Sequence, residues 1–202
     1  MAFAIDQEHL PAVLTSHPMT DDEFAALCSE HPDLFFEMTA EGELIIMAAT
    51  FSIPGLRNAE IGAQLRNWAK RDRRGLVSDS STGFVLPNGA RRSPDAAWML
   101  KARVAKMNPA EREGFWHLCP DFVIELRSPS DRPRSIREKM QEWIANGAAL
   151  AWLIEPAERA ITIYRPGRDP EKLVEIDSLP GEGPVQGFVL ELPDIWDPLR
   201  DN

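Results

Sequence analysis

The sequence lacks any long apolar run. No stretch approaches the roughly 20 consecutive apolar residues that a membrane-spanning helix needs. The first 14 residues, which include Asp6, Glu8 and His9, lack the basic start and apolar middle of a secretory signal. We therefore expect a cytoplasmic protein with no membrane partner.

Cysteine is scarce, with only Cys28 and Cys119 in 202 residues. The two lie far apart, and neither has a second cysteine at CxxC spacing or a histidine-rich neighbourhood. This pattern predicts two reduced thiols rather than a disulfide or a zinc site.

The sequence has fewer basic than acidic residues, 22 Lys and Arg against 32 Asp and Glu. The formal net charge is −10, and the isoelectric point is near 4.9. Such a balance argues against tight non-specific binding to DNA, because that affinity comes largely from Lys and Arg that neutralise phosphates. Cations nevertheless gather in two clusters, and for the first cluster a solvated helix face is the simpler interpretation. The clusters are Arg66, Lys70, Arg71, Arg73 and Arg74, and Arg127, Arg132, Arg134, Arg137 and Lys139.

What is present is the composition of one globular domain spanning residues 1–202, with 44% hydrophobic and 27% charged residues and no internal repeats. Its core is expected at about 34–196, after a short helical extension that opens with a capping box at Thr20 and Glu23. Apolar periodicity predicts a hairpin, strands and three further helical segments. Helices are expected at 57–74, 107–114 and 135–146, the hairpin at 34–38 and 43–47, and strands at 76–77, 84–86, 95–100, 122–124, 150–154, 161–164 and 188–190.

The run Phe122-Val123-Ile124 is continuously apolar, which is typical of a strand buried on both faces of a sheet. Helical segments come before and after it in the chain. The order of elements indicates an α/β, or α+β, fold with a mixed central sheet flanked by helices. Trp143, which lies in an apolar period, is expected to pack in the core.

Two acidic residues stand in strand-like surroundings, Asp95 after Ser93-Pro94 and Glu125 after the apolar run. A glutamate there is costly to bury unless it is paired or bound to a metal. Two explanations remain open. One is a structural ion pair with Arg127 or Lys139, and the other is a divalent-cation site shared with Asp95.

The combined motifs resemble the Uma-type family of putative restriction endonucleases, which belongs to the PD-(D/E)XK nuclease superfamily. The resemblance runs from about Glu37 to Trp196. It rests on Ser93-Pro94-Asp95, Pro120 to Asp131, Lys139-Met140, Asn146-Gly147, Trp152-Leu153-Ile154, Gly42-Glu43-Leu44, Arg57-Asn58 and Ser80 to Phe84.

This resemblance implies a restriction-endonuclease-like fold in which Asp95 and Glu125 bind Mg²⁺ or Mn²⁺. The position that usually holds the superfamily's lysine is Arg127, and relatives that supply the lysine from the following helix point to Lys139. Lys139 would orient the attacking water or stabilise the transition state. Glu60 and Glu37 are candidates for a further acidic residue, each with a solvated position as the simpler alternative.

The function that follows is Mg²⁺-dependent hydrolysis of DNA phosphodiester bonds. A metal-activated water attacks phosphorus, while Lys139 and Arg127 offset the developing negative charge. The expected partners are DNA and a second copy of the chain. The alternative is a catalytically silent interaction module that keeps the nuclease fold, with Asp95, Glu125 and Lys139 locked in a salt-bridge cluster.

Overall fold

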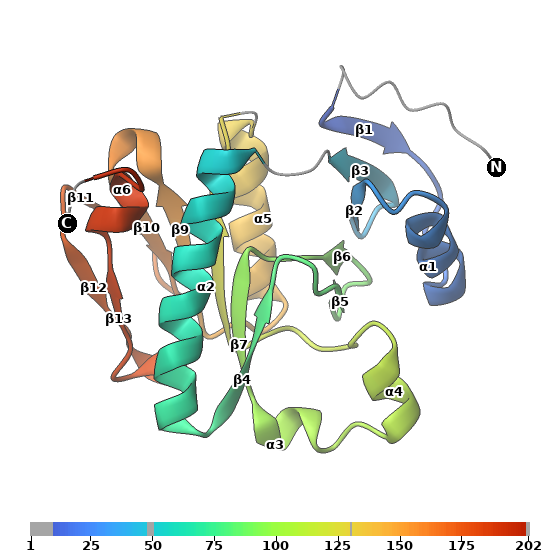
Figure 1. The fold of residues 1–202 in the computed structure, drawn as a ribbon. Helices are drawn as coiled ribbons and strands as arrows, with labels where there is room; N and C mark the ends of the chain where they lie inside the picture. Colours follow the sequence, from blue (N-terminus) through green and yellow to red (C-terminus); the bar gives the residue numbers. More distant parts are fainter. Residues whose placement is uncertain (1–9, 48–50, 130, 201–202) are drawn as a thin grey trace.

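A six-stranded mixed sheet forms the centre of the protein (Figure 1). The computed structural model describes residues 10–47, 51–129 and 131–200. The strand order is β11-β10-β9-β8-β7-β4, in which β8 and β9 run parallel and the other neighbours antiparallel. These strands are β4 (Gly75–Asp79), β7 (Ala96–Leu100), β8 (Phe122–Leu126), β9 (Leu150–Glu155), β10 (Ala160–Tyr164) and β11 (Glu171–Val174).

Two helices cover opposite faces of this sheet, α2 (Ser52–Asp72) and α5 (Pro133–Ala145). Successive residues of a strand point to opposite faces, so β8 sends Ile124 into the core under α2 and Val123 into the core under α5. The predicted mixed sheet with a buried central strand and a helix on each face is confirmed.

Helix α2 begins five residues before its predicted start at Arg57. Pro54 lies in the first turn of the helix, where a proline is tolerated because the amides there have no intrahelical partner. The helix also ends earlier than predicted, where Arg73 takes a left-handed conformation with φ of 63°. Gly75, the first residue of the next strand, allows a close approach, because a Cβ there would lie 2.1 Å from the Trp98 ring.

A second, five-stranded sheet lies beside the first, in the order β1-β3-β2-β6-β5. The predicted hairpin and the capped helix before it are confirmed, and Gly42 makes the hairpin turn with φ of 92°. The elements of this part are β1 (Ala12–Thr15), α1 (Asp21–Glu30), β2 (Phe35–Met38), β3 (Glu43–Met47), β5 (Phe84–Val85) and β6 (Arg91–Arg92).

Several short elements escaped the sequence analysis because they are brief or polar, as the two-arginine strand β6 is. Two of the remaining elements were predicted, α4 (Pro109–Glu113) at 107–114 and β13 (Val189–Glu191) at 188–190. The elements that were not predicted are α3 (Lys101–Val104), two 3₁₀ turns (Pro156–Glu158 and Gly183–Val185), β12 (Ser178–Pro180) and α6 (Pro193–Trp196). No helix in the described ranges is long and apolar enough to cross a membrane. Both cysteines are free thiols, as predicted.

Candidate active site

Strand pairing brings Asp95 and Glu125 together. Strands β7 and β8 pair antiparallel, with Ala96 opposite Ile124, so the next position places Asp95 beside Glu125. The Leu126 amide donates a hydrogen bond of 2.7 Å to Asp95 Oδ2. Two carboxylates 30 residues apart in the chain thus become neighbours at the ends of adjacent strands.

The Glu125 side chain is buried and held by α5. The Trp143 indole Nε1 and the Lys139 ammonium each lie 2.8 Å from Glu125 Oε1. Residues four apart lie on the same side of a helix, so α5 presents both donors together. The buried Glu125 carboxylate is therefore compensated by a cation and by a hydrogen-bond donor, as a buried charge requires.

The hairpin supplies a third carboxylate. Glu37, on β2, is buried, and its Oε1 lies 2.8 Å from Lys139 Nζ. Arg92 Nη1 donates to Glu37 Oε2 at 3.2 Å, and the Ser93 amide donates to Oε1 at 2.9 Å. Lys139 thus bridges Glu37 and Glu125, and joins the hairpin to the central sheet.

Burial and mutual repulsion set the protonation of these carboxylates. Burial raises the pKa of Glu125 to about 8, with the Lys139 charge opposing and the nearby Asp95 and Glu37 adding to the rise. Burial also raises the pKa of Asp95, against the hydrogen bond from the Leu126 amide. For Glu37, burial is outweighed by Lys139 and Arg92, so its pKa is lowered. Negative charge on Asp95 and Glu125 is therefore unfavourable without a metal, and a bound cation would stabilise the charged form of both carboxylates.

Lys139 remains protonated at neutral pH. Burial works to lower its pKa, but the Glu125 and Glu37 carboxylates outweigh burial and raise it above the usual value. A protonated lysine donates hydrogen bonds and offsets negative charge, but it accepts no proton from water.

Arg127 and Glu60 lie apart from this cluster. Arg127 does not pair with Glu125; its Nη1 lies 3.0 Å from both Glu155 Oε1 and Glu158 Oε1. Glu60, on another side of α2, accepts a hydrogen bond of 2.8 Å from Gln64. Of the two acidic candidates, Glu37 is therefore the one that the fold brings to Glu125, through Lys139.

The sequence analysis missed three polar neighbours of the site. Trp143 does pack in the core, but its indole N–H also holds Glu125; a buried indole needs an acceptor, and its i+4 spacing from Lys139 was the available signal. Asn58 Nδ2 donates to Asp95 Oδ1 at 2.7 Å. Asp131 accepts from the Ser128 amide at 2.7 Å, and its charge adds to the rise in the pKa of Asp95.

The donor set suits a magnesium-type ion. Among the described residues no cluster of three or more His, Cys, Asp or Glu side chains could enclose a metal. Mg²⁺, however, is usually held by one or two carboxylates and completes its shell with water and substrate phosphate. The buried Asn58 Oδ1, beside Asp95, has no partner in the described structure, so a further hard oxygen is available. Asp95 and Glu125 fit such an ion.

The mixed sheet, with a helix on each face and carboxylates at the ends of two neighbouring strands, is a restriction-endonuclease-like fold. Residues 21–193 match the Uma2 family model, described as "Putative restriction endonuclease". The chain belongs to this family, and the resemblance seen in the sequence is confirmed.

A solved structure shares the fold. It is the crystal structure of a putative nuclease belonging to DUF820 from Anabaena variabilis, with a TM-score of 0.73 and 22% sequence identity. The match covers 89% of this chain and 98% of that one. No curated protein matches the chain.

Proposed function

We propose that this protein is a divalent-metal-dependent DNA endonuclease that hydrolyses phosphodiester bonds. The observation that carries the proposal is the meeting of Asp95 and Glu125 at the ends of β7 and β8, with the Lys139 ammonium 2.8 Å from Glu125. Membership of the Uma2 family supports the nuclease class.

In this proposal Asp95 and Glu125 hold Mg²⁺ or Mn²⁺. An ion held there would lower the pKa of a water ligand and would neutralise phosphate charge. Asn58 and the Leu126 amide fix the Asp95 carboxylate, and Trp143 fixes Glu125. These contacts keep the two side chains in place before any substrate arrives.

Lys139 stabilises the charge that develops on the phosphate. Because its neighbours keep it protonated, a role in electrostatic stabilisation fits better than a role as a base. We assign this role to Lys139 rather than to Arg127, since the Arg127 guanidinium is engaged by Glu155 and Glu158.

One observation favours the silent module instead. Lys139 already satisfies Glu37 and Glu125 in a closed ion-pair network, as a structural cluster would. The net charge of −10 points the same way. The two functions differ in whether a metal ion is bound and whether DNA is cut.

Plasmid cleavage tests the nuclease proposal. The protein is expected to nick supercoiled plasmid when Mn²⁺ or Mg²⁺ is present and to lose this activity in chelator. Asp95→Asn keeps the side-chain shape but removes the charge, and is expected to reduce the rate by at least about 100-fold, the scale seen when one preorganised electrostatic group is lost. A metal-independent rate, or equal rates for both proteins, would refute the proposal.

We also propose that the protein acts as a homodimer, so that the basic clusters of two subunits act on one duplex. Light scattering at micromolar concentration is expected to give twice the chain mass of 22.7 kDa. A mass of one chain at that concentration would rule the dimer out.

A further inference from the structure

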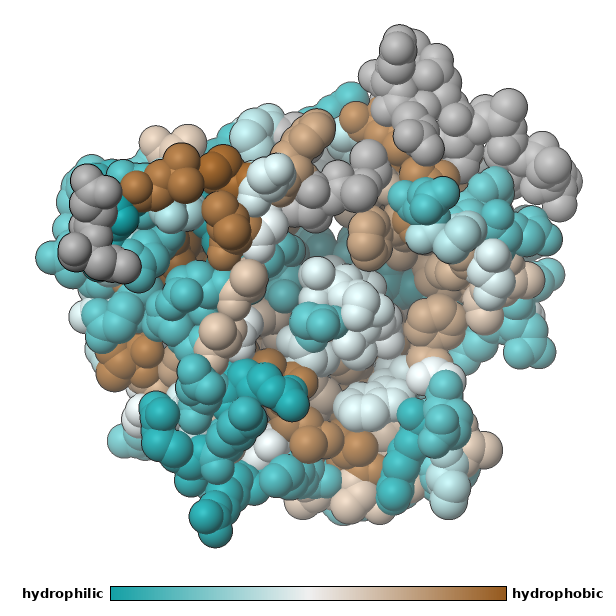
Figure 2. Space-filling model, viewed as in Figure 1, coloured by the Kyte–Doolittle hydropathy of each residue, from teal (hydrophilic) through white to brown (hydrophobic). Residues whose placement is uncertain are grey.

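Positive charge is concentrated in the C-terminal part of α2 and the two residues that follow it. Residues 66–74 contain five cations and one acid, a formal charge of +4 in a chain of −10, so the other 193 residues carry −14. A basic segment on so acidic a protein is a local attraction for a polyanion. Figure 2 shows a hydrophilic surface over this end of α2.

Only some of these cations make ion pairs or ring contacts within the protein. Arg74 pairs with Asp72 at 2.7 Å and lies over the Trp98 ring, 5.7 Å from its centroid. Arg66 and Lys70 are exposed, and in the described part of the chain neither has a recorded ion pair, although cations on other elements do pair with acids. Their charges are thus free to meet a ligand.

Stabilisation of helix α2 does not explain why both Arg66 and Lys70 are cations. Lys70 stands in the last turn of α2, where a cation complements the helix dipole, but Arg66 stands before that turn. Arg66 and Lys70 are four residues apart, so two like charges face each other on one side of the helix, which opposes helix formation. An anion between them would remove this repulsion.

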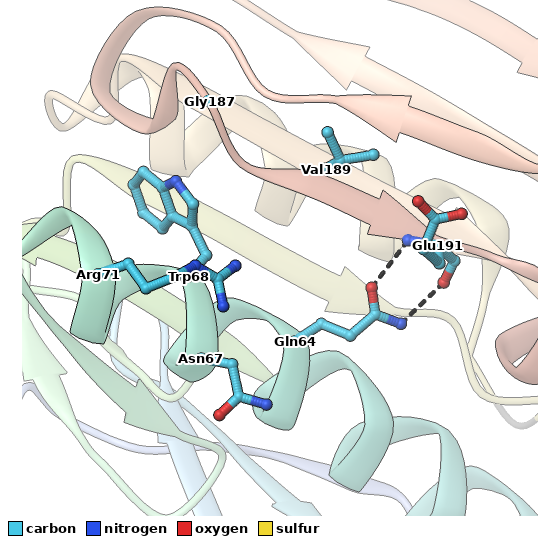
Figure 3. A pocket seen from close by; sticks show the side chains of 7 residues that line it. All are labelled: Gln64, Asn67, Trp68, Arg71, Gly187, Val189 and Glu191. Atoms are coloured by element: carbon cyan, nitrogen blue, oxygen red, sulfur yellow. Dashed lines mark hydrogen bonds between the residues drawn. The ribbon is translucent and has the colours of Figure 1, made fainter.

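Arg66 and Lys70 lie on a different side of α2 from the one that contacts the C-terminal strand β13. The opposite flank forms a pocket of about 390 Å³ against β13, seen in Figure 3. There Gln64 is hydrogen-bonded in both directions to the backbone of Glu191, and Arg71 lines the same pocket as Glu191. At 100° per residue, Arg66 and Lys70 turn away from that side.

The same helix carries Asn58, which binds Asp95. At 1.5 Å per residue, Arg66 and Lys70 lie about 12 and 18 Å along the axis from Asn58. One DNA strand places a phosphate every ~3.4 Å, so this separation spans roughly three to five phosphates. The pair therefore lies a few phosphates, measured along the axis of α2, from the residue that binds Asp95.

We propose that Arg66 and Lys70 form a docking surface for the phosphate backbone of duplex DNA, on the strand that leads to Asp95 and Glu125. The proposal rests on the nuclease function for the identity of the ligand. The contact is to phosphates, so it carries no base sequence preference.

The test compares two variants of equal net charge. Arg66→Gln/Lys70→Gln and Arg168→Glu both change the formal charge from −10 to −12, and Arg168 is exposed on the turn before β11. Gln is a good helix former, so α2 should persist, which a thermal melt checks. Binding to a fluorescent duplex of arbitrary sequence is measured in chelator between about 50 and 200 mM salt.

The double variant is expected to bind more weakly and to lower the slope of log affinity against log salt by about 2, roughly one for each phosphate contact. Arg168→Glu should match the unsubstituted protein. Equal loss in both variants, no loss in the double variant, or no salt-dependent binding by the unsubstituted protein overturns the docking surface. Plasmid nicking distinguishes failure of the docking surface from failure of the nuclease proposal. If the double variant binds and nicks DNA like the unsubstituted protein, the docking surface is refuted but the nuclease proposal stands.

Discussion

Mn²⁺ or Mg²⁺ is expected to stabilise this protein by about 2.7 kcal/mol when the ion is present at 100 times its dissociation constant. Asp95 and Glu125 are neighbours whose pKa values are raised by burial, so negative charge on both of them at once is unfavourable in the metal-free protein. An ion that binds only the folded state relieves this cost. The melting temperature should rise by roughly 5–11 °C in a chain of this length.

Two variants localise the effect. Asp95→Asn removes one carboxylate and should abolish the metal-dependent rise. Glu155→Gln neutralises another buried carboxylate, at the end of β9 and paired with Arg127, and should keep the rise even if its metal-free melting point falls. An unsubstituted protein that gains nothing from metal would leave the silent module as the better account.

Lys139→Met is expected to cost about 3–5 kcal/mol of unfolding free energy, because it leaves two buried carboxylates, Glu37 and Glu125, without their shared cation. Methionine keeps the length of the side chain and suits a helix, so the lost charge dominates the effect. Thermal melts should show a fall of roughly 6–20 °C. Where the variant still folds, plasmid cleavage should be lost, because the proposed role of Lys139 is to stabilise the transition state.

Arg134→Met is the matched control for this change. Arg134 lies on the same helix, and its 2.7 Å pair with Glu138 is exposed to water, so the variant should melt with the unsubstituted protein. Lys139→Met/Glu125→Gln should recover part of the lost stability, since Glu125, the carboxylate that Lys139→Met leaves without a cation, is then neutral, whereas Glu37 keeps Arg92. A Lys139→Met protein as stable as Arg134→Met would show that the bridge contributes nothing.

The central sheet could be predicted because its signals are local. Phe122 to Ile124 form a continuous apolar run, and the helix stripes on each side have a clear 3.6-residue period. The strands at Arg91–Arg92 and Glu171–Val174 could not be predicted, because pairing with neighbours, rather than their own composition, makes them strands.

The site was predictable where it depends on strand alternation and less so where it depends on contacts between distant segments. Asp95, directly before β7, and Glu125, within β8, stand out as carboxylates next to apolar strand residues. That Lys139 rather than Arg127 meets Glu125 depends on how α5 crosses the sheet, and that Glu37 joins them depends on where the hairpin packs. No periodicity in the sequence reports either packing arrangement.

The most direct measurement is the anomalous scattering of Mn²⁺ in crystals of the protein soaked with that ion. We predict one strong peak about 2.1 Å from oxygens of both Asp95 and Glu125, an octahedral distance for a hard divalent ion. Asp95→Asn crystals soaked in the same way should show no peak there. An unsubstituted protein without a peak at these carboxylates, with Lys139 still bridging Glu37 and Glu125, would contradict this prediction.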